Sequence, residues 1–531
     1  MNHRCGRVVR FVAFSFCAAP LMTFGFAEAQ LTDKTQTPNT AGEGINKSFA
    51  EQIGAGRGDL LTPDASLFIV KRDPFRAIRR GRQVFQRKFT GAQGLGPRTF
   101  DGTGDIETEL SLGAGVMDSC AGCHGRPRGS AGAGGDVFTR PDSRDAPHLF
   151  GLGLVEMLGD EITSDLRVLR ALAVTDAQSS GVPATRLLSS KGIHYGQIRA
   201  FPDGSVDPSL VEGVDPDLRV RPFFHHGGTM SIREFVVGAF NAEMGLEAFD
   251  PDTAAAAAGG IVVTPSGMVL NGTIDSIEAP PVTSVFDDAD GDGVVDEIPV
   301  SIVDFMEFYL LNYFKAATYI ETPKVRNGRT FFAQVGCTEC HVPNLRIDRD
   351  RRVADVETVY DDANGIFNNL FSTASARLVA SDDGSGHPTL KTPELQPFLV
   401  ENIYADFKRH DLGPSFHERN FDGTVTTRFM TEPLWGVATT APYGHDGRSV
   451  NLREVILRHG GEAQASRDAF AALPGRSQSA IVQFLESLVL FPPDDTASNL
   501  NPGDPATPGF PQKGHGSIAL TVLFNDPTDP E

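Results

Sequence analysis

The stretches Cys120-Ala-Gly-Cys123-His124 and Cys337-Thr-Glu-Cys340-His341 are two copies of the pentapeptide C-x-x-C-H. When c-type haem is attached, the two Cys sulfurs form thioethers to the porphyrin and the adjacent imidazole binds the iron from one face. A redox disulfide or half of a zinc site also uses C-x-x-C, but neither requires a His directly after the second Cys. We therefore expect two covalently bound haem c groups, with their irons bound by His124 and His341.

The N-terminus predicts export of the protein. Residues 1–29 combine three Arg, an apolar stretch from Phe11 to Phe26 and the cleavage pattern Ala27-Glu28-Ala29, which together are typical of a signal peptide. The apolar stretch is short for a membrane-spanning helix, and no later stretch approaches the ~18 uninterrupted apolar residues that spanning requires. We expect a periplasmic mature protein with no membrane span, in which every Cys belongs to one of the two motifs.

The charge of the chain limits its partners. There are 47 Lys and Arg against 68 Asp and Glu, which gives a formal net charge of −21. Loss of the signal peptide removes three Arg and one Glu, so the mature chain carries −23. Because phosphate groups are also negative, this charge argues against nucleic acid as a partner, whereas a basic or neutral electron donor is tolerated.

The body of the chain contains an internal repeat. Residues 224–236 resemble residues 444–456, with Ile232-Arg233-Glu234 matching Leu452-Arg453-Glu454. The offset of this match is 220 residues, close to the 217 residues that separate the two motif histidines. Two copies of one haem-binding unit account for both spacings.

The two copies differ at one position of a predicted helix. From Leu452 to His459, three apolar residues and then His459 occupy positions i, i+3, i+4 and i+7, so His459 lies on the apolar face. His459 is a candidate sixth ligand of the second iron, and a core histidine is the alternative. Ala239 stands 220 residues earlier, and alanine cannot bind iron. We expect a six-coordinate second haem with His341 and His459, and a first haem with an open face for a small oxidant.

Several short segments, taken together with these motifs, resemble a known group of proteins. They are Gly94-Leu95-Gly96-Pro97, residues 149–154, residues 238–245, His410-Asp411-Leu412-Gly413-Pro414, residues 440–448 and residues 459–463. Together they resemble the bacterial di-haem cytochrome c peroxidase superfamily, which includes the di-haem enzyme of methylamine utilisation and the rubber oxygenases. Within it, the chain is most similar to the di-haem oxidoreductase (thiol oxidoreductase) family. The resemblance covers roughly residues 65–490.

This resemblance implies a mainly α fold with two cytochrome-c-like helical haem domains, long loops and few short strands. It also implies a peroxidatic first haem and an electron-transfer second haem. The peroxidases of this group place a Met where this chain has His459, and an imidazole lowers the haem potential relative to a thioether. Those peroxidases use a distal Glu for acid–base chemistry, and Glu243 is its best match. His148, His225 and His226 are rival distal groups.

The stretch Asp288-Ala-Asp290-Gly-Asp292-Gly293 begins like a calcium loop, with oxygen donors at alternate positions and a Gly that allows the turn. Pro299 stands where the twelfth-position Glu of such loops is usual. Asp296 or Glu297 would then complete a shell formed by Asp288, Asp290, Asp292 and the carbonyl of Val294. The alternative is an acidic linker without a metal.

The expected organisation has six segments: a signal peptide (1–29), a disordered N-terminal segment (30–60), an N-terminal haem domain with the catalytic haem (61–275), a connector with the calcium loop (276–320), a C-terminal haem domain with the electron-transfer haem (321–490) and a Pro/Asp-rich tail (491–531). The expected function is reduction of a peroxide at the first haem, with electrons from a periplasmic donor relayed through the second. Two alternatives stay open: an oxygenase that cleaves a hydrophobic substrate with O₂, and a di-haem electron carrier.

Overall fold

The computed structural model describes residues 49–96, 119–124, 145–149, 151–289, 291–312, 317–318, 321–352, 378–379, 389–390, 397–420 and 423–489. The expected signal peptide, the expected tail and the calcium-loop residue Asp290 lie outside these residues. None of the helices in the described ranges is long and apolar enough to cross a membrane.

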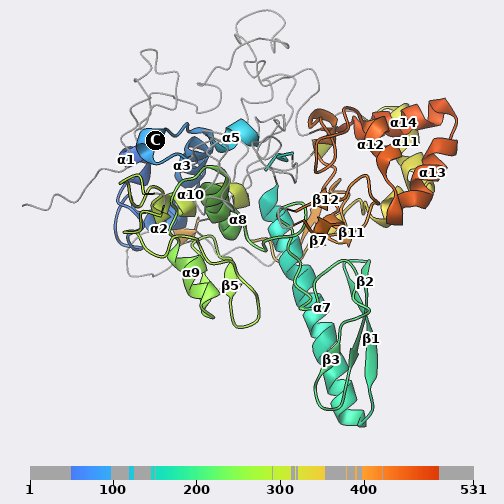
Figure 1. Cartoon of the computed structure of the whole chain (residues 1–531), viewed down its shortest axis with the longest axis horizontal. Helices are drawn as coiled ribbons and strands as arrows, with labels where there is room; N and C mark the ends of the chain where they lie inside the picture. The colour runs from blue at the N-terminus through green and yellow to red at the C-terminus, as the bar shows by residue number, and fades with distance from the viewer. Residues whose placement is uncertain are drawn as a thin grey trace, which may run out of the picture.

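Helices form most of the regular structure in the described residues (Figure 1). The α-helices are α1 (Phe49–Ile53), α2 (Ser66–Arg72), α3 (Pro74–Gln86), α5 (Cys120–Cys123), α7 (Leu152–Ser180), α8 (Ile232–Gly238), α9 (Pro251–Ala257), α10 (Val300–Asn312), α11 (Pro323–Gln334), α12 (Leu452–Arg458), α13 (Gln464–Ala472) and α14 (Gly475–Leu485). A π-helical turn, η2 (Ala239–Glu243), continues α8, and 3₁₀ turns occur at η1 (Gly91–Gln93), η3 (Cys337–Glu339), η4 (Val437–Thr439) and η5 (Gly461–Ala463). The mainly helical class is confirmed, whereas the cytochrome-c-like type of each domain stays a prediction.

Most strands are short and pair two by two. The antiparallel pairs are β4 (Ile261–Val263) with β5 (Val269–Asn271), β6 (Ala317–Thr318) with β15 (Leu488–Val489), β7 (Leu345–Ile347) with β10 (Phe398–Val400), β8 (Leu378–Val379) with β9 (Thr389–Leu390), β11 (Arg409–His410) with β14 (Phe429–Met430), and β12 (Glu418–Arg419) with β13 (Val425–Thr426). They fasten loops to one another rather than forming a layer. The few short strands expected from the sequence are therefore found.

The larger of two main hydrophobic cores is built around α10. Every residue from Ser301 to Asn312 is buried, because α3, α7 and α8 pack around this helix. Gly81 allows the close approach of α3, since a Cβ there would lie 2.3 Å from the carbonyl oxygen of Phe305. This core places α8 and α10 beside the first haem-attachment motif.

The smaller core holds α11 and α14 together, with Phe332, Tyr404 and Phe484 in edge-to-face contact. Leu345 and Val400, on β7 and β10, belong instead to the larger core, although both lie within the expected C-terminal haem domain. The larger core is thus shared by residues of both expected haem domains. The domain boundaries themselves stay predictions.

An arm built on α7 projects from the body of the molecule (Figure 1). The C-terminal part of this helix packs against a three-stranded sheet of β1 (Ala184–Ser190), β2 (Ile193–Ala200) and β3 (Val206–Asp207). The turn between β1 and β2 is Lys191-Gly192, with φ of 51° and 81°, the left-handed conformation that two-residue hairpins need. This hairpin was not among the elements predicted from the sequence.

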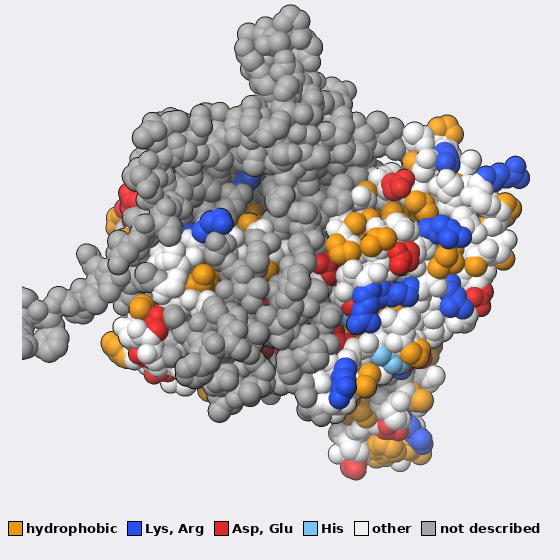
Figure 2. All heavy atoms as spheres, turned by 45° about the horizontal axis from the view of Figure 1, so that its top comes forward, with side chains coloured by type: hydrophobic (Ala, Val, Ile, Leu, Met, Phe, Trp, Pro, Cys, Tyr) orange, Lys and Arg blue, Asp and Glu red, His pale blue; other side chains and the backbone are white. Residues whose placement is uncertain are grey.

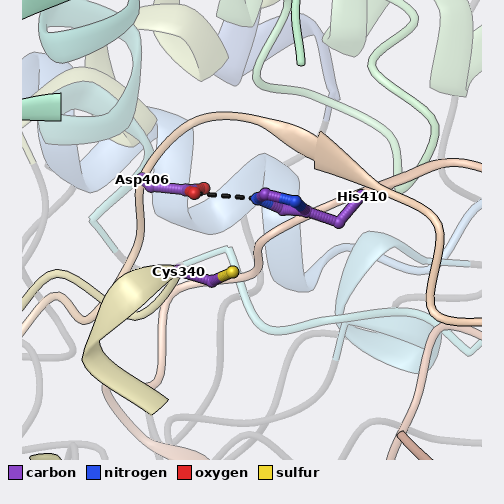
Figure 3. Close-up of side chains that lie close together, drawn as sticks. All are labelled: Cys340, Asp406 and His410. Carbon is purple, nitrogen blue, oxygen red and sulfur yellow. Dashed lines mark hydrogen bonds and ion pairs between the residues drawn. The ribbon is translucent and has the colours of Figure 1, made fainter. Parts of the chain in front are cut away.

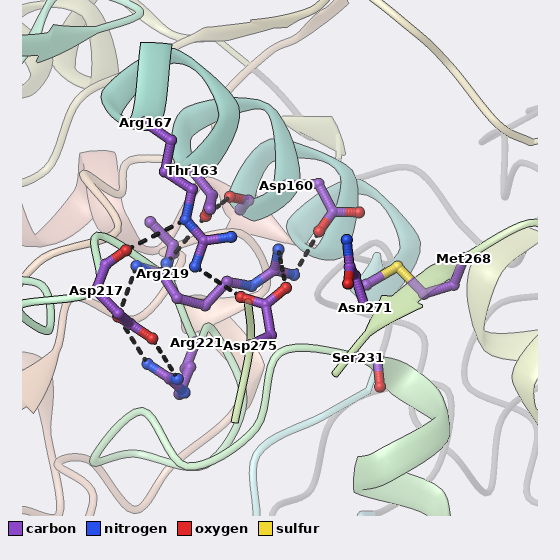
Figure 4. A network of polar contacts seen from close by, with 12 residues as sticks. Asp160, Thr163, Arg167, Asp217, Arg219, Arg221, Ser231, Met268, Asn271 and Asp275 are labelled. Atoms are coloured by element: carbon purple, nitrogen blue, oxygen red, sulfur yellow. Dashed lines mark hydrogen bonds and ion pairs between the residues drawn. The ribbon is translucent and has the colours of Figure 1, made fainter. Parts of the chain in front are cut away.

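Ion pairs attach the arm to the body of the molecule (Figure 4). Arg167 on α7 binds Asp275 at 2.7 Å, and Arg219 binds Asp160 at 2.5 Å. The Thr163 hydroxyl accepts a hydrogen bond from the backbone of Val220 at 3.0 Å. The contacts of Asp160 and Thr163 hold the segment before α8 against α7, and Arg167 holds the segment after β5 against the same helix.

The expectation of disorder over residues 30–60 is wrong for its last part. Residues 49–53 form α1, in which Phe49 is fully buried. The Phe49 ring meets Phe89 edge to face, with 5.8 Å between the ring centroids, and the Arg87 guanidinium lies 5.0 Å from the Phe49 ring centre. The polar composition of residues 30–60 suggested disorder, but the apolar side chain of Phe49 packs in the core and orders the last part of this segment.

A buried ionic cluster joins α8 to α10. Arg233 on α8 is fully buried and donates to Asp250 at 2.9 Å, Asp304 at 3.0 Å and Glu307 at 2.8 Å. Because the carboxylates lose their water on folding, the guanidinium is the partner that keeps their charge tolerable. The cluster therefore sets the position of α8.

We expect Arg233→Ala to lower the free energy of unfolding by about 3–5 kcal/mol, since it leaves buried carboxylates unpaired. The matched control is Arg186→Ala, which removes an exposed pair with Asp176 and should cost about 0–1 kcal/mol. Urea unfolding of the two variants and the wild type measures both numbers. Equal, small losses in the two variants would show that the cluster does not stabilise the fold.

Candidate haem sites

Both C-x-x-C-H motifs open onto one cavity of about 460 Å³. Its lining includes all the residues that the sequence assigns to haem attachment, together with the candidate sixth ligand and the candidate acid–base group: Cys120, Cys123, His124, Cys337, Cys340, His341, His459 and Glu243. Trp435, the only Trp of the chain, is also part of the lining. The fold therefore brings together two motifs that stand more than two hundred residues apart.

The two motif imidazoles are held in the same way. The backbone N–H of His124 donates to Cys120 at 2.9 Å, and that of His341 donates to Cys337 at 2.9 Å, so each motif forms one helical turn. The Nδ1 atom of His124 lies 2.7 Å from the carbonyl oxygen of Pro147, and that of His341 lies 3.0 Å from the carbonyl oxygen of Tyr404. A ring that donates from Nδ1 to a carbonyl keeps Nε2 for a metal.

The surroundings of the motifs fit a covalently attached haem. None of the four motif cysteines forms a disulfide with another described residue, and burial raises the pKa of Cys120 and Cys337 to about 12, so both are neutral thiols. Burial also lowers the pKa of His341, which keeps the imidazole neutral and able to bind a metal. The rest of the lining is largely apolar, as a porphyrin requires, and includes Phe235, Phe240, Met306, Leu310, Phe332, Phe416 and Ile456.

His459 closes the C-terminal end of α12. Its Nδ1 lies 2.7 Å from the carbonyl oxygen of Val455, so Nε2 again carries the lone pair. Burial first, and the neighbouring His341 in addition, lower the pKa of His459 to about 4. The Phe416 ring meets the imidazole edge to face at 5.3 Å. A neutral, buried imidazole in the same cavity as His341 fits a sixth ligand, and the assignment stays a prediction.

Two other histidines near the second motif have different partners. His410 uses both ring nitrogens on carboxylates, with Nδ1 2.7 Å from Glu462 and Nε2 2.8 Å from Asp406. His445 stacks on Phe429 with 3.8 Å between the ring centroids, and its Nε2 faces Glu418 at 3.6 Å. Neither arrangement offers a lone pair to iron as directly as that of His459.

The first unit has no side-chain ligand at the matching position. Ala239 and Phe240 on η2 line the cavity, as do Phe235 and Val236 on α8. The Phe235 ring lies 6.0 Å from the ring of His124, so α8 covers the first motif. Glu243, the last residue of η2, reaches the same cavity. The sequence prediction that placed Glu243 near the first haem is therefore compatible with the fold.

The rival distal histidines have hydrogen-bond or stacking partners of their own, although His148 and His225 also line the cavity. His148 lies with its Nε2 3.0 Å from the carbonyl oxygen of Trp435, and burial lowers its pKa to about 4. His225 uses Nδ1 on Glu432 and Nε2 on the carbonyl oxygen of Asp145, both at 2.9 Å. His226 stacks on Phe224 and lines a different, more open pocket. All three positions favour structural roles.

The proposed calcium loop shows only part of a shell. Asp288 accepts a hydrogen bond from the backbone of Gly293 at 3.1 Å, and Asp292 accepts one from Val294 at 2.7 Å. Burial raises the pKa of Asp296 to about 6. Within the described residues, which exclude Asp290, these carboxylates do not converge as a set of three. Calcium binding stays a prediction.

One cluster of side chains was missed by the sequence analysis. Cys340, Asp406 and His410 place their sulfur, oxygen and nitrogen atoms within 4.8 Å of one another beside the second motif (Figure 3). The signal for it was present in His410-Asp411-Leu412-Gly413-Pro414, which the sequence analysis used only as part of the family resemblance. The partners of His410 could not be read from that stretch.

Comparisons with known proteins give a family match over part of the chain. The family model described as di-haem oxidoreductase, putative peroxidase, matches residues 347–488, a range that contains His410 and His459. No curated protein matches the chain. Among solved structures, a MauG-like protein associated with microbial copper homeostasis is 14% identical over 36% of this chain and 55% of that chain, with a TM-score of 0.20. The match thus spans about half of that protein, and at this TM-score it does not establish a common fold. Over residues 347–488, this chain is similar to the family described as di-haem oxidoreductase, putative peroxidase.

Proposed function

We propose that this protein is a periplasmic di-haem c oxidoreductase that reduces a peroxide at its N-terminal haem with electrons relayed through its C-terminal haem. The observation that carries the proposal is that the two sides of one shared cavity are lined by different residues. On the side of the second motif it has the neutral imidazole of His459, whereas on the side of the first motif it has Ala239 at the matching register. An iron with a protein ligand on both faces stores electrons, and an iron with one open face can meet an oxidant.

The two haems, when bound, would supply the one-electron redox chemistry that no amino-acid side chain of this site provides. The chain itself would attach them through Cys120 and Cys123 and through Cys337 and Cys340. The carbonyls of Pro147 and Tyr404 would fix the ring orientation of His124 and His341 by accepting their Nδ1 protons. The phenylalanines on α8 and η2 would exclude water from the first site.

Glu243 is the candidate proton carrier. Splitting a peroxide needs a base that takes the proton from one oxygen and an acid that returns it to the departing oxygen. A carboxylate at the end of η2 can do both, because one Oε atom accepts the proton and then donates it. Among the cavity-lining residues of the first unit, Glu243 combines a titratable side chain with a position next to Ala239 and Phe240.

The C-terminal unit could receive an electron donor without strong charge repulsion. Residues 321–490 carry 18 Lys and Arg against 22 Asp and Glu, and residues 61–275 carry 21 against 26. The acidic surplus is densest in the connector, residues 276–320, which carries 1 against 9. Figure 2 shows basic side chains among hydrophobic ones over the C-terminal unit, at the right of the view. This nearly balanced surface repels neither an acidic nor a basic donor strongly.

We expect His459→Ala to retain two haems and to convert the second haem from low spin to high spin, since its sixth ligand is removed. Electron paramagnetic resonance of the oxidised protein, with haem content measured by mass, gives the result. His194→Ala, on the exposed face of β2 in the arm, is the matched control and should leave the spectrum unchanged. An intact low-spin signal in His459→Ala would assign the sixth ligand to another residue.

Glu243→Gln keeps the size of the side chain and removes its proton chemistry. We expect it to bind both haems and to react with hydrogen peroxide at least ~100-fold more slowly, the magnitude of a positioned acid–base group. Stopped-flow absorbance of the haem band measures the rate, and the exposed Glu278→Gln serves as control. A wild-type rate in Glu243→Gln removes this residue from the mechanism.

A wild-type protein that ignores peroxide but holds O₂ stably would favour the oxygenase alternative.

Calcium binding at the Asp288–Asp296 loop is the remaining part of the proposal. Metal bound only by the folded state stabilises it, so a chelator should lower the thermal midpoint of the wild type. The double variant Asp290→Ala/Asp292→Ala should start from the lower midpoint and no longer respond to the chelator. A wild type shown to contain calcium, yet with no change of midpoint on chelation, would contradict a stabilising site.

A further inference from the structure

His410 is a buried side chain between two carboxylates beside the second haem motif, and Figure 3 shows it with one of them, Asp406. It stands on β11, is 7% exposed, and donates from Nε2 to Asp406 at 2.8 Å and from Nδ1 to Glu462 at 2.7 Å. A ring can donate from both nitrogens only as an imidazolium. Burial alone would lower the pKa of His410, but the hydrogen bond with Asp406 raises it well above its usual range. The network is therefore a cation between two carboxylates.

One arm of this network reaches the side of the site that holds His341. Asp406 is 1% exposed and follows Tyr404 by two residues, and the Tyr404 carbonyl is the one that accepts from the Nδ1 of His341. The backbone N–H of Ala405 donates to Val342 at 3.1 Å, which fastens this segment to the residue after the motif. Fixing Asp406 thus fixes the carbonyl that orients His341.

The other arm reaches the side that holds His459. Glu462 lies three residues after His459, and its second carboxylate oxygen accepts from the backbone of Asp411 at 3.1 Å. The backbones of Gly460 and Glu462 donate to Leu412 and Asp411, both at 2.9 Å. Gly461 makes this contact possible, because its φ is 49° and a Cβ there would lie 2.1 Å from the Asp411 carbonyl oxygen.

We propose that His410 is a positioning residue that ties the two imidazoles of the second haem site together, holding His341 through Asp406 and His459 through Glu462. The inference rests on the proposed function, since it takes His459 as the sixth ligand. A metal ligand must be held at one distance and one angle, and outer partners that orient ligands typically contribute 10–100-fold to metal affinity. Without His410, the buried Asp406 and the exposed Glu462 lose their common counter-charge and the loops that carry the ligands separate.

The test is a competition between His459 and cyanide in the oxidised protein with both haems attached. The bis-imidazole low-spin signal of the second haem is followed by electron paramagnetic resonance as cyanide is added. In His410→Gln, we expect the cyanide concentration that replaces half of this signal to fall at least about tenfold, because the internal ligand is held less firmly. His410→Arg, which can donate to two carboxylates, should recover part of the loss.

His417→Ala is the matched control, since His417 lies on the same loop and pairs with Asp411 at 2.8 Å at the surface. It should leave the cyanide midpoint unchanged. Glu462→Gln is the milder variant in case His410→Gln does not fold, and it should shift the midpoint in the same direction. An unchanged midpoint in both His410→Gln and Glu462→Gln would overturn the proposal.

The failures of the two proposals can be told apart. If His459→Ala keeps the low-spin signal, the sixth-ligand assignment is wrong and the role of His410 falls with it. If His459→Ala loses the signal while His410→Gln and Glu462→Gln keep the wild-type cyanide midpoint, only the role of His410 is overturned. A lowered midpoint in His410→Gln, with two haems still attached and His417→Ala unaffected, supports it.

Discussion

The hydrogen bond from a motif imidazole to a backbone carbonyl is the interaction on which both haem sites depend. It fixes the tautomer of the ring and aims Nε2, and it occurs twice, from His124 to Pro147 and from His341 to Tyr404. In each case the carbonyl comes from a loop that is held by more distant parts of the fold. The loops, short strand pairs and ionic clusters of this protein matter because they keep those two carbonyls in place.

The difference between the two sites has a simple physical origin. Burial lowers the pKa of His459 to about 4, and a neutral imidazole is a ligand, so this side chain is suited to bind iron. The first site has an alanine at the matching register and a carboxylate at the end of the same π-helical turn. One repeated unit can therefore give an electron store and an oxidant site through a change at a single helix position.

The two sites are also tied to each other. Arg351, after β7 in the C-terminal half, pairs with Glu156 on α7, and Glu156 accepts a hydrogen bond from the backbone of Ile232 at 2.8 Å. Ile232 is the first residue of α8, the helix that covers the first motif. A charge from the second unit thus supports the N-terminal end of a helix at the first site.

The sequence by itself predicted two haem groups and a two-unit repeat, because these depend on covalent spacing and on the repeat offset, and its resemblance to a known family implied the mainly helical class. The C-x-x-C-H motif can be recognised from five residues, and the repeat offset alone matches His459 to Ala239. The tertiary structure alone decided which groups hold those ligands. His341 meets a carbonyl 63 residues away, and His410 meets a carboxylate 52 residues away. It also revealed the hairpin of the arm and the order of residues 49–53. Contacts of this range form only when separate segments pack together and lose their water, and no local pattern records which segments will meet.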